Sequence, residues 1–156
     1  MLGTTARKLR ILGFDSLYDS KSQDKDLVQK AASSGRILLT SDFELYALAK
    51  NSRVNAIFVD STNEKMKLFQ VLIKSGVRQV RVGELASRCS LCNGELFLTD
   101  ETSPKNGKIY HCFLCRKNYW YGSHWKKMGL FFEEVNSLLA ANMRAKFRVS
   151  DKYDRE

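Results

Sequence analysis

The chain has 156 residues, of which 44% are hydrophobic and one is proline, a composition typical of a packed globular protein and not of a disordered chain. Its formal net charge of +9 favours a polyanionic partner, most commonly nucleic acid, although a solvated basic face would give the same composition. No apolar run reaches the ~18 residues of a membrane span, and the N-terminus lacks a signal-peptide pattern, which predicts a cytoplasmic protein without a membrane partner.

Helices alternate with short apolar strands from the N-terminus onward. Residues 1–13 have helical spacing, with apolar residues on one face, basic residues on the other and a glycine as the stop. FDSLY (14–18) is predicted to form a short strand. A second helix over 24–35 ends at a glycine, and RILLT (36–40) follows as an apolar strand of the kind that is buried on both faces.

The same alternation continues to about residue 82. The stretches SDFE (41–44) and STNE (61–64) each place a serine three residues before a glutamate, the pattern of a capping box at the start of a helix. NAIFV (55–59) and VRQVRV (77–82) are predicted strands. Strands and helices in this order predict an α/β fold with a parallel sheet and right-handed crossovers.

All four cysteines of the chain stand in two matched pairs, Cys89 with Cys92 and Cys112 with Cys115. Two C-x-x-C knuckles brought together by a hairpin can present four thiolates tetrahedrally to Zn²⁺. Disulfides are the competing interpretation, but a cytosolic compartment would keep the thiols reduced. Because four protein ligands leave no open position for water or substrate, the zinc is expected to be structural.

The composition changes at about Ser87, where Cys, Tyr, Trp and turn residues become frequent. Helical spacing then returns and continues to Phe147. The sequence therefore predicts four regions: an α/β domain (1–86), a zinc ribbon (87–122), a C-terminal helix (123–147) and a charged tail (148–156).

Aromatic and basic residues alternate at the end of the ribbon and the start of the last helix, a mixture suited to stacking bases and neutralising phosphates. Alternatively, the aromatic side chains pack the ribbon onto the α/β domain, and the histidine caps the following helix. The candidate RNA-binding residues of this region are Lys117, Tyr119, Trp120, His124, Lys126 and Lys127.

Three aspartates are predicted at the carboxyl edge of the sheet, where open α/β sheets gather functional groups. Asp42 and Asp60 follow strands, and Asp24 lies near the start of a helix. Clustered carboxylates can share a Mg²⁺ or Mn²⁺ ion that orients water for attack on phosphorus. For each aspartate alone, a stabilising position at a helix N-terminus is an equally good explanation.

The runs MLGTTARKLRILGFD, DKDLVQKAASSGRILLTSDFEL, RCSLCNGEL and YWYGSHWKKM resemble the Mut-seven C-terminal RNase domain family, over roughly residues 1–128. The resemblance implies a PIN-like three-layer α/β/α fold with an appended zinc ribbon, and metal-dependent RNase activity. It matches Asp24 and Asp42 to family acids and the four cysteines to the ribbon ligands. It also matches Arg7 and Arg10 to basic residues of the first helix, which are expected to bind RNA. Asp60 rests on the strand-end argument.

In that family a strand ending in aspartate comes just before the segment that corresponds to Met1 and Leu2. The first strand is therefore expected to be missing from this sheet. Either the coding sequence begins further upstream, or the chain is shorter and its metal site lacks one ligand.

These patterns favour an endoribonuclease, a hydrolase that cuts phosphodiesters in RNA, structured RNA or a ribonucleoprotein. A second hypothesis is a non-catalytic RNA-binding or ribonucleoprotein-associated module, which would bind RNA in a salt-sensitive way without turnover. A third is a protein-interaction adaptor built on the zinc ribbon, which would bind no RNA at physiological salt.

Overall fold

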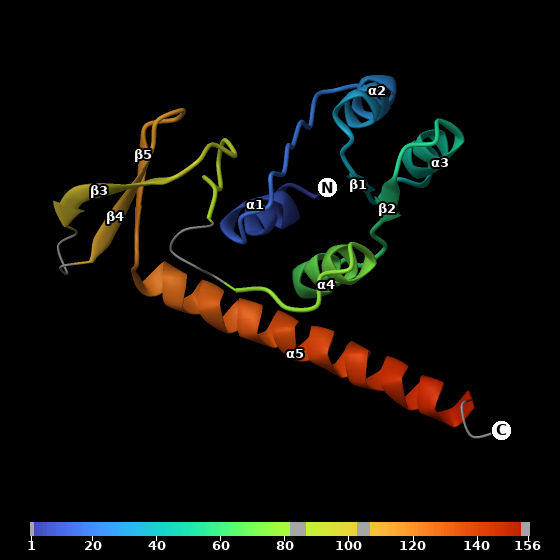
Figure 1. Ribbon diagram of the computed structural model, residues 1–156. Helices are drawn as coiled ribbons and strands as arrows, with labels where there is room; N and C mark the ends of the chain where they lie inside the picture. Colours follow the sequence, from blue (N-terminus) through green and yellow to red (C-terminus); the bar gives the residue numbers. More distant parts are fainter. Residues whose placement is uncertain (1, 82–86, 103–106, 154–156) are drawn as a thin grey trace.

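The computed structural model describes residues 2–81, 87–102 and 107–153, with side chains described up to residue 145 except that of residue 102. An α/β part, an antiparallel ribbon and a long C-terminal helix follow one another along the chain (Figure 1). The helices are α1 (Gly3–Ile11), α2 (Asp24–Ser34), α3 (Phe43–Asn51), α4 (Glu64–Lys74) and α5 (Ser123–Tyr153). The strands are β1 (Leu38–Thr40), β2 (Ala56–Phe58), β3 (Phe97–Thr102), β4 (Lys108–Cys112) and β5 (Lys117–Trp120).

Strands β1 and β2 form the parallel sheet that the sequence predicts. Leu38 pairs with Ala56 and Thr40 with Phe58, and the N–H of Val59 extends the pairing by donating to the Thr40 carbonyl at 2.8 Å. Helix α3 makes the crossover between the two strands. The α/β class is therefore confirmed, whereas the PIN-like three-layer arrangement stays a prediction.

Two of the predicted strands are wrong. Residues 14–18 are irregular because their backbone bonds to side chains and not to a neighbouring strand: the Ser16 N–H donates to Asn93 Oδ1 at 3.0 Å. Residues 77–81 are also irregular. There the Asn136 side chain on α5 donates to the Val80 carbonyl at 2.8 Å and accepts from its N–H at 2.9 Å, in place of a strand partner. Val82, the last residue of that predicted strand, lies outside the described residues.

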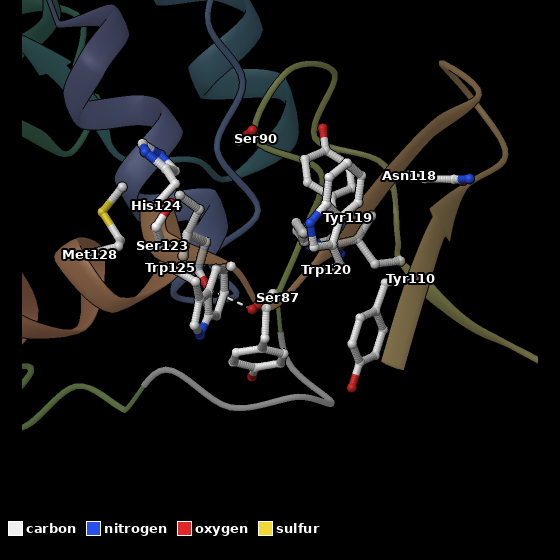
Figure 2. Close-up of a pocket in the computed structure, with 15 residues that line it drawn as sticks. Ser87, Ser90, Tyr110, Asn118, Tyr119, Trp120, Ser123, His124, Trp125 and Met128 are labelled. Carbon is white, nitrogen blue, oxygen red and sulfur yellow. Dashed lines mark hydrogen bonds between the residues drawn. The ribbon is translucent and has the colours of Figure 1, made fainter. Parts of the chain in front are cut away.

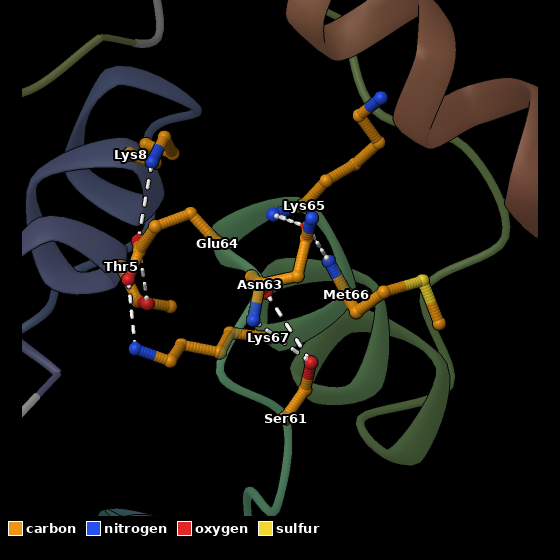
Figure 3. A network of polar contacts seen from close by, with 8 residues as sticks. All are labelled: Thr5, Lys8, Ser61, Asn63, Glu64, Lys65, Met66 and Lys67. Atoms are coloured by element: carbon orange, nitrogen blue, oxygen red, sulfur yellow. Dashed lines mark hydrogen bonds and ion pairs between the residues drawn. The ribbon is translucent and has the colours of Figure 1, made fainter.

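The helix starts differ from the two predicted capping boxes. Asp42 caps α3 and Asn63 caps α4, each accepting from two backbone N–H groups of the first turn. Ser61 instead accepts from the Asn63 N–H at 3.1 Å (Figure 3). The caps therefore come from Asp42 and Asn63, which directly precede the helices, so that their side-chain oxygens meet the second and third N–H groups.

Helices α1, α4 and α5 share the main hydrophobic core. On α5, Phe132, Val135 and Leu139 are almost fully buried, and they pack in one cluster with Leu68 and Leu72 of α4. The expected helix is therefore present, and it continues past its predicted end at Phe147 to Tyr153. Within the described residues, no helix is both long enough and apolar enough to span a bilayer.

Candidate metal centre and acidic cavity

The four cysteine sulfurs converge on one point of the ribbon. Sγ of Cys89 lies 3.4 Å from Sγ of Cys115, Sγ of Cys92 lies 3.4 Å from Sγ of Cys112, and all four sulfurs lie within 4.8 Å of one another. Tetrahedral zinc with bonds of about 2.3 Å places its sulfur ligands about 3.8 Å apart. The separations fit four ligands around one ion and are far longer than the ~2.05 Å of a disulfide.

Each knuckle is closed by a tight backbone turn. Asn93, at φ 70°, donates from its N–H to the Cys89 carbonyl, and Arg116, at φ 58°, donates to that of Cys112. Gly94 lets the two knuckles approach, because a Cβ at this position would lie 2.8 Å from a Leu114 side-chain carbon and 3.1 Å from Cys112 Sγ. The local sequence thus builds the four-sulfur cluster.

The thiols of the cluster differ in acidity. Burial tends to raise the pKa of the Cys89 thiol, but hydrogen bonds from the Tyr119 hydroxyl and from the backbone of Cys92 and Leu91 lower it to about 6. Burial and hydrogen bonds to neighbouring sulfurs raise the pKa of Cys115 to about 12. The lowered pKa favours the thiolate form of Cys89, which is the form in which a cysteine binds a metal.

Arg10 fastens this ribbon to α1. It is 6% exposed, and its guanidinium donates to the carbonyls of Ser90 at 3.0 Å, Leu91 at 2.9 Å and Ser16 at 2.7 Å. Burial lowers the pKa of Arg10. Arg7, on the same helix, is exposed to solvent. The RNA-binding role of both arginines stays a prediction.

A cavity of about 880 Å³ lies between α1, β1 and the start of α2, and it brings two of the three predicted acids together. Asp24 and Asp42 both line it, as do Asp15 and Asp19, which the sequence did not single out. Asp60 does not line it, and its carboxylate accepts a hydrogen bond from Gln70. Asp24 and Asp42 thus line one cavity, and their catalytic role stays a prediction.

These acids do not form a preassembled three-ligand site. In the described parts of the chain, the four cysteines are the one group of three or more metal-binding side chains. Asp42 Oδ1 is occupied as the cap of α3, accepting from the N–H groups of Glu44 at 2.7 Å and Leu45 at 3.1 Å. None of its described hydrogen bonds involves Oδ2, so one oxygen of Asp42 stays available to a ligand.

The candidate RNA-binding residues of the ribbon and α5 are mostly exposed. Trp120 is 55% exposed, and Lys117 and His124 are also on the surface. Tyr119 is half-buried, and its hydroxyl lies 3.0 Å from Cys89 Sγ. Tyr119 thus contacts the four-cysteine cluster directly.

The fold and the site define the class: an α/β protein with a four-cysteine cluster whose geometry can hold a metal ion. A comparison with family models matches residues 1–132 to the Mut7-C RNAse domain. The chain therefore belongs to the Mut7-C RNAse domain family, which confirms the resemblance read from its motifs and indicates an RNase-type function with RNA as substrate. No curated protein and no solved structure matches it.

Proposed function

We propose that the protein is a metal-dependent endoribonuclease that hydrolyses RNA phosphodiesters in the 880 Å³ cavity beside α1 and β1. The observation that supports this most is that Asp24 and Asp42, carried by separate elements, line the same cavity of a chain in an RNase family. Asp60 lies outside the cavity, so the proposal rests on the other two acids.

Two carboxylates suffice for the kind of ion that the proposal needs. Mg²⁺ is commonly held by one or two carboxylates, with waters and substrate phosphates completing its octahedral shell. A bound Mg²⁺ or Mn²⁺ would supply an activated water and offset charge on the reacting phosphate. Asp24 and the free Oδ2 of Asp42 would hold the ion, while Lys30, which lines the same cavity, would attract the RNA backbone.

The ribbon has a structural part in this proposal. Its zinc would fix the strands that carry Lys117, Tyr119 and Trp120, and the first turns of α5 add Lys126 and Lys127. Together with the net charge of +9 these residues support RNA, structured RNA or a ribonucleoprotein as the partner.

The test is cleavage of a labelled, partly structured RNA with Mg²⁺ or Mn²⁺. We expect Asp42→Asn to abolish cutting without loss of fold, because an asparagine Oδ1 still caps α3. Asp24→Asn should also abolish it. Asp26→Asn is the matched control: it removes the same charge from the first turn of α2 but does not line the cavity, so cutting should continue. Equal activity in all three variants would contradict the proposal.

The variant Asp60→Asn tests whether the third predicted acid takes part in catalysis. Since the Asp60 carboxylate bonds to Gln70 and lies outside the cavity, we expect this variant to cut RNA at the normal rate. Loss of cutting with an unchanged far-UV spectrum would return Asp60 to the catalytic set.

A second candidate function is RNA binding without catalysis. It is favoured by the fact that, within the described residues, no three acids lie close enough to share an ion. It predicts binding that weakens steeply between about 50 and 200 mM salt, with no cutting in any divalent ion. The labelled RNA of the cleavage test can report both outcomes, its binding to the protein and its cleavage.

A further inference from the structure

A second cavity, of about 370 Å³, opens where the ribbon meets the start of α5, and it shares no lining residue with the acidic cavity. Figure 2 shows Tyr119 and Trp120 of β5 and Trp125 of the first turn of α5 around it. Much of its wall is aromatic. The aromatic lining residues are Tyr110, Tyr119, Trp120, Tyr121 and Trp125.

The aromatic rings are held by contacts on the protein side. The Tyr119 hydroxyl bonds to Cys89 Sγ at 3.0 Å, which ties one wall to the metal centre. Tyr121 and Trp125 meet edge to face, with ring centroids 4.8 Å apart. Trp120 stays 55% exposed. Contacts within the protein therefore hold the aromatic walls of the pocket in place, and the exposed ring of Trp120 can stack on a ligand.

The charge around the pocket favours an anionic occupant. Among the described residues, Arg88 lines it and no carboxylate does. Lys126 and Lys127 are exposed on the adjoining turns of α5. An aromatic slot with cations beside it combines the two features that single-stranded nucleic acid uses, a face for the base and positive charge for the phosphate.

We propose that this pocket holds one unpaired nucleobase of the RNA, stacked on Trp120, an inference that rests on the proposed ribonuclease function. Helix α1 connects the two sites, because Leu9 lines the acidic cavity and Ile11 lines the aromatic pocket. A base captured in the pocket would therefore fix which nearby phosphodiester reaches Asp24 and Asp42. The RNA must be single-stranded at the nucleotide whose base enters the pocket.

The chain supplies its own reporter for this test. It contains two tryptophans, Trp120 and Trp125, and both line the pocket. The experiment titrates zinc-loaded Asp42→Asn protein with a single-stranded oligouridine and with a base-free sugar-phosphate strand of the same length, at low salt and without added Mg²⁺ or Mn²⁺. We expect the oligouridine to quench tryptophan fluorescence, because a base stacks on indole, and the base-free strand to bind more weakly without quenching. Equal binding of the two strands overturns the inference.

Variants locate the contact. In the same background, Trp120→Ala should weaken oligouridine binding about ten- to hundredfold, while Trp120→Phe, which keeps an aromatic face, should restore most of it. Phe113→Ala is the matched control, since Phe113 is an aromatic residue of the ribbon, 69% exposed, that does not line the pocket. Its Kd should not change. A similar loss of oligouridine affinity in Phe113→Ala and Trp120→Ala, or no loss in either variant, would show that the base does not bind in this pocket.

The assay separates this inference from the proposed function. If wild-type protein cuts RNA but Trp120→Ala binds it normally, the pocket proposal falls and the ribonuclease stands. If oligouridine binding depends on the pocket but the wild-type protein cuts no RNA, the base pocket stands and the catalytic proposal is wrong. If an uncharged aromatic or proline-rich peptide quenches the tryptophans and oligouridine does not, the pocket is a protein-docking site and the nucleobase assignment is wrong.

Discussion

Glu64, in the first turn of α4, joins two helices through its carboxylate. Oε2 accepts from Lys8 Nζ at 3.2 Å and from Thr5 Oγ1 at 3.3 Å, both on α1, and Oε1 accepts from Lys67 Nζ at 2.9 Å (Figure 3). Burial tends to raise the pKa of Glu64, but the bonds from Lys67 and Lys8 lower it below the ordinary 4.5. The charged form of this carboxylate therefore stabilises the fold.

Replacing Glu64 by glutamine should lower the free energy of unfolding by about 1–2 kcal/mol at neutral pH, because Lys8 is left with little solvent and no anion. A carboxylate with a depressed pKa contributes stability above its unfolded value and loses it as the pH falls through the folded value. The difference between Glu64→Gln and wild type should thus be full above pH 4.5 and shrink below it. Urea unfolding at several pH values measures this.

Glu134→Gln is the control for Glu64. Glu134 pairs with Lys65 but its side chain is 58% exposed, so its loss should change stability by less than about 0.5 kcal/mol. An effect equal to that of Glu64→Gln, or one independent of pH, would show that the α1–α4 contact does not depend on the carboxylate charge.

At the scale of elements, the ribbon has little apolar core of its own. Cys89 and Cys112 are fully buried, but Phe97, Leu98, Phe113 and Leu114 are each close to half exposed or more. Strand β4 pairs with β3 on one side and with β5 on the other, and Arg10 supplies a polar link to α1. The four-sulfur centre is therefore expected to supply much of the folding energy of this element.

Removing zinc should unfold the ribbon and leave the α/β part folded. We expect a zinc-loaded chain to contain one equivalent of zinc, and a strong chelator or Cys112→Ser to release it. Tryptophan fluorescence should change, because Tyr119 loses its sulfur partner beside the aromatic pocket, while far-UV circular dichroism should retain its helical signal. A metal-free protein with native fluorescence would contradict this expectation.

At the scale of the whole molecule, α5 joins the ribbon to the α/β part. Its first turn lines the aromatic pocket, and its middle buries Phe132, Val135 and Leu139 against α4. Asn136 adds the two hydrogen bonds to Val80. The last helix is thus part of the main core, while the predicted boundary between ribbon and helix at residues 122 and 123 stays a prediction.

A core mutation in the C-terminal helix should destabilise the α/β part. Leu139 is fully buried, and Leu139→Ala should cost about 2–5 kcal/mol of the free energy of unfolding. Leu130→Ala on the same helix, where the side chain is 62% exposed, should cost less than about 0.5 kcal/mol. Thermal or urea unfolding followed by helix signal compares the two. Equal stability of the two variants would show that α5 does not pack on the core in solution.

The sequence by itself determined the features that depend on local spacing. The two C-x-x-C knuckles predicted the four-sulfur cluster, because each pair lies on one tight turn whose geometry is set within a few residues. Glycine stops and apolar periodicity predicted the helices and the strands β1 and β2. The family motifs are likewise local, and the match over residues 1–132 confirmed them.

The tertiary structure decided what depends on partners far along the chain. The segments 14–18 and 77–81 look like strands, but their backbone groups bond to Asn93 and Asn136. Arg10 looks like a free surface cation, but it bonds to carbonyls of a knuckle some 80 residues away. Backbone polar groups and buried charges take the partner that the folded chain brings near them, and no local pattern specifies that partner.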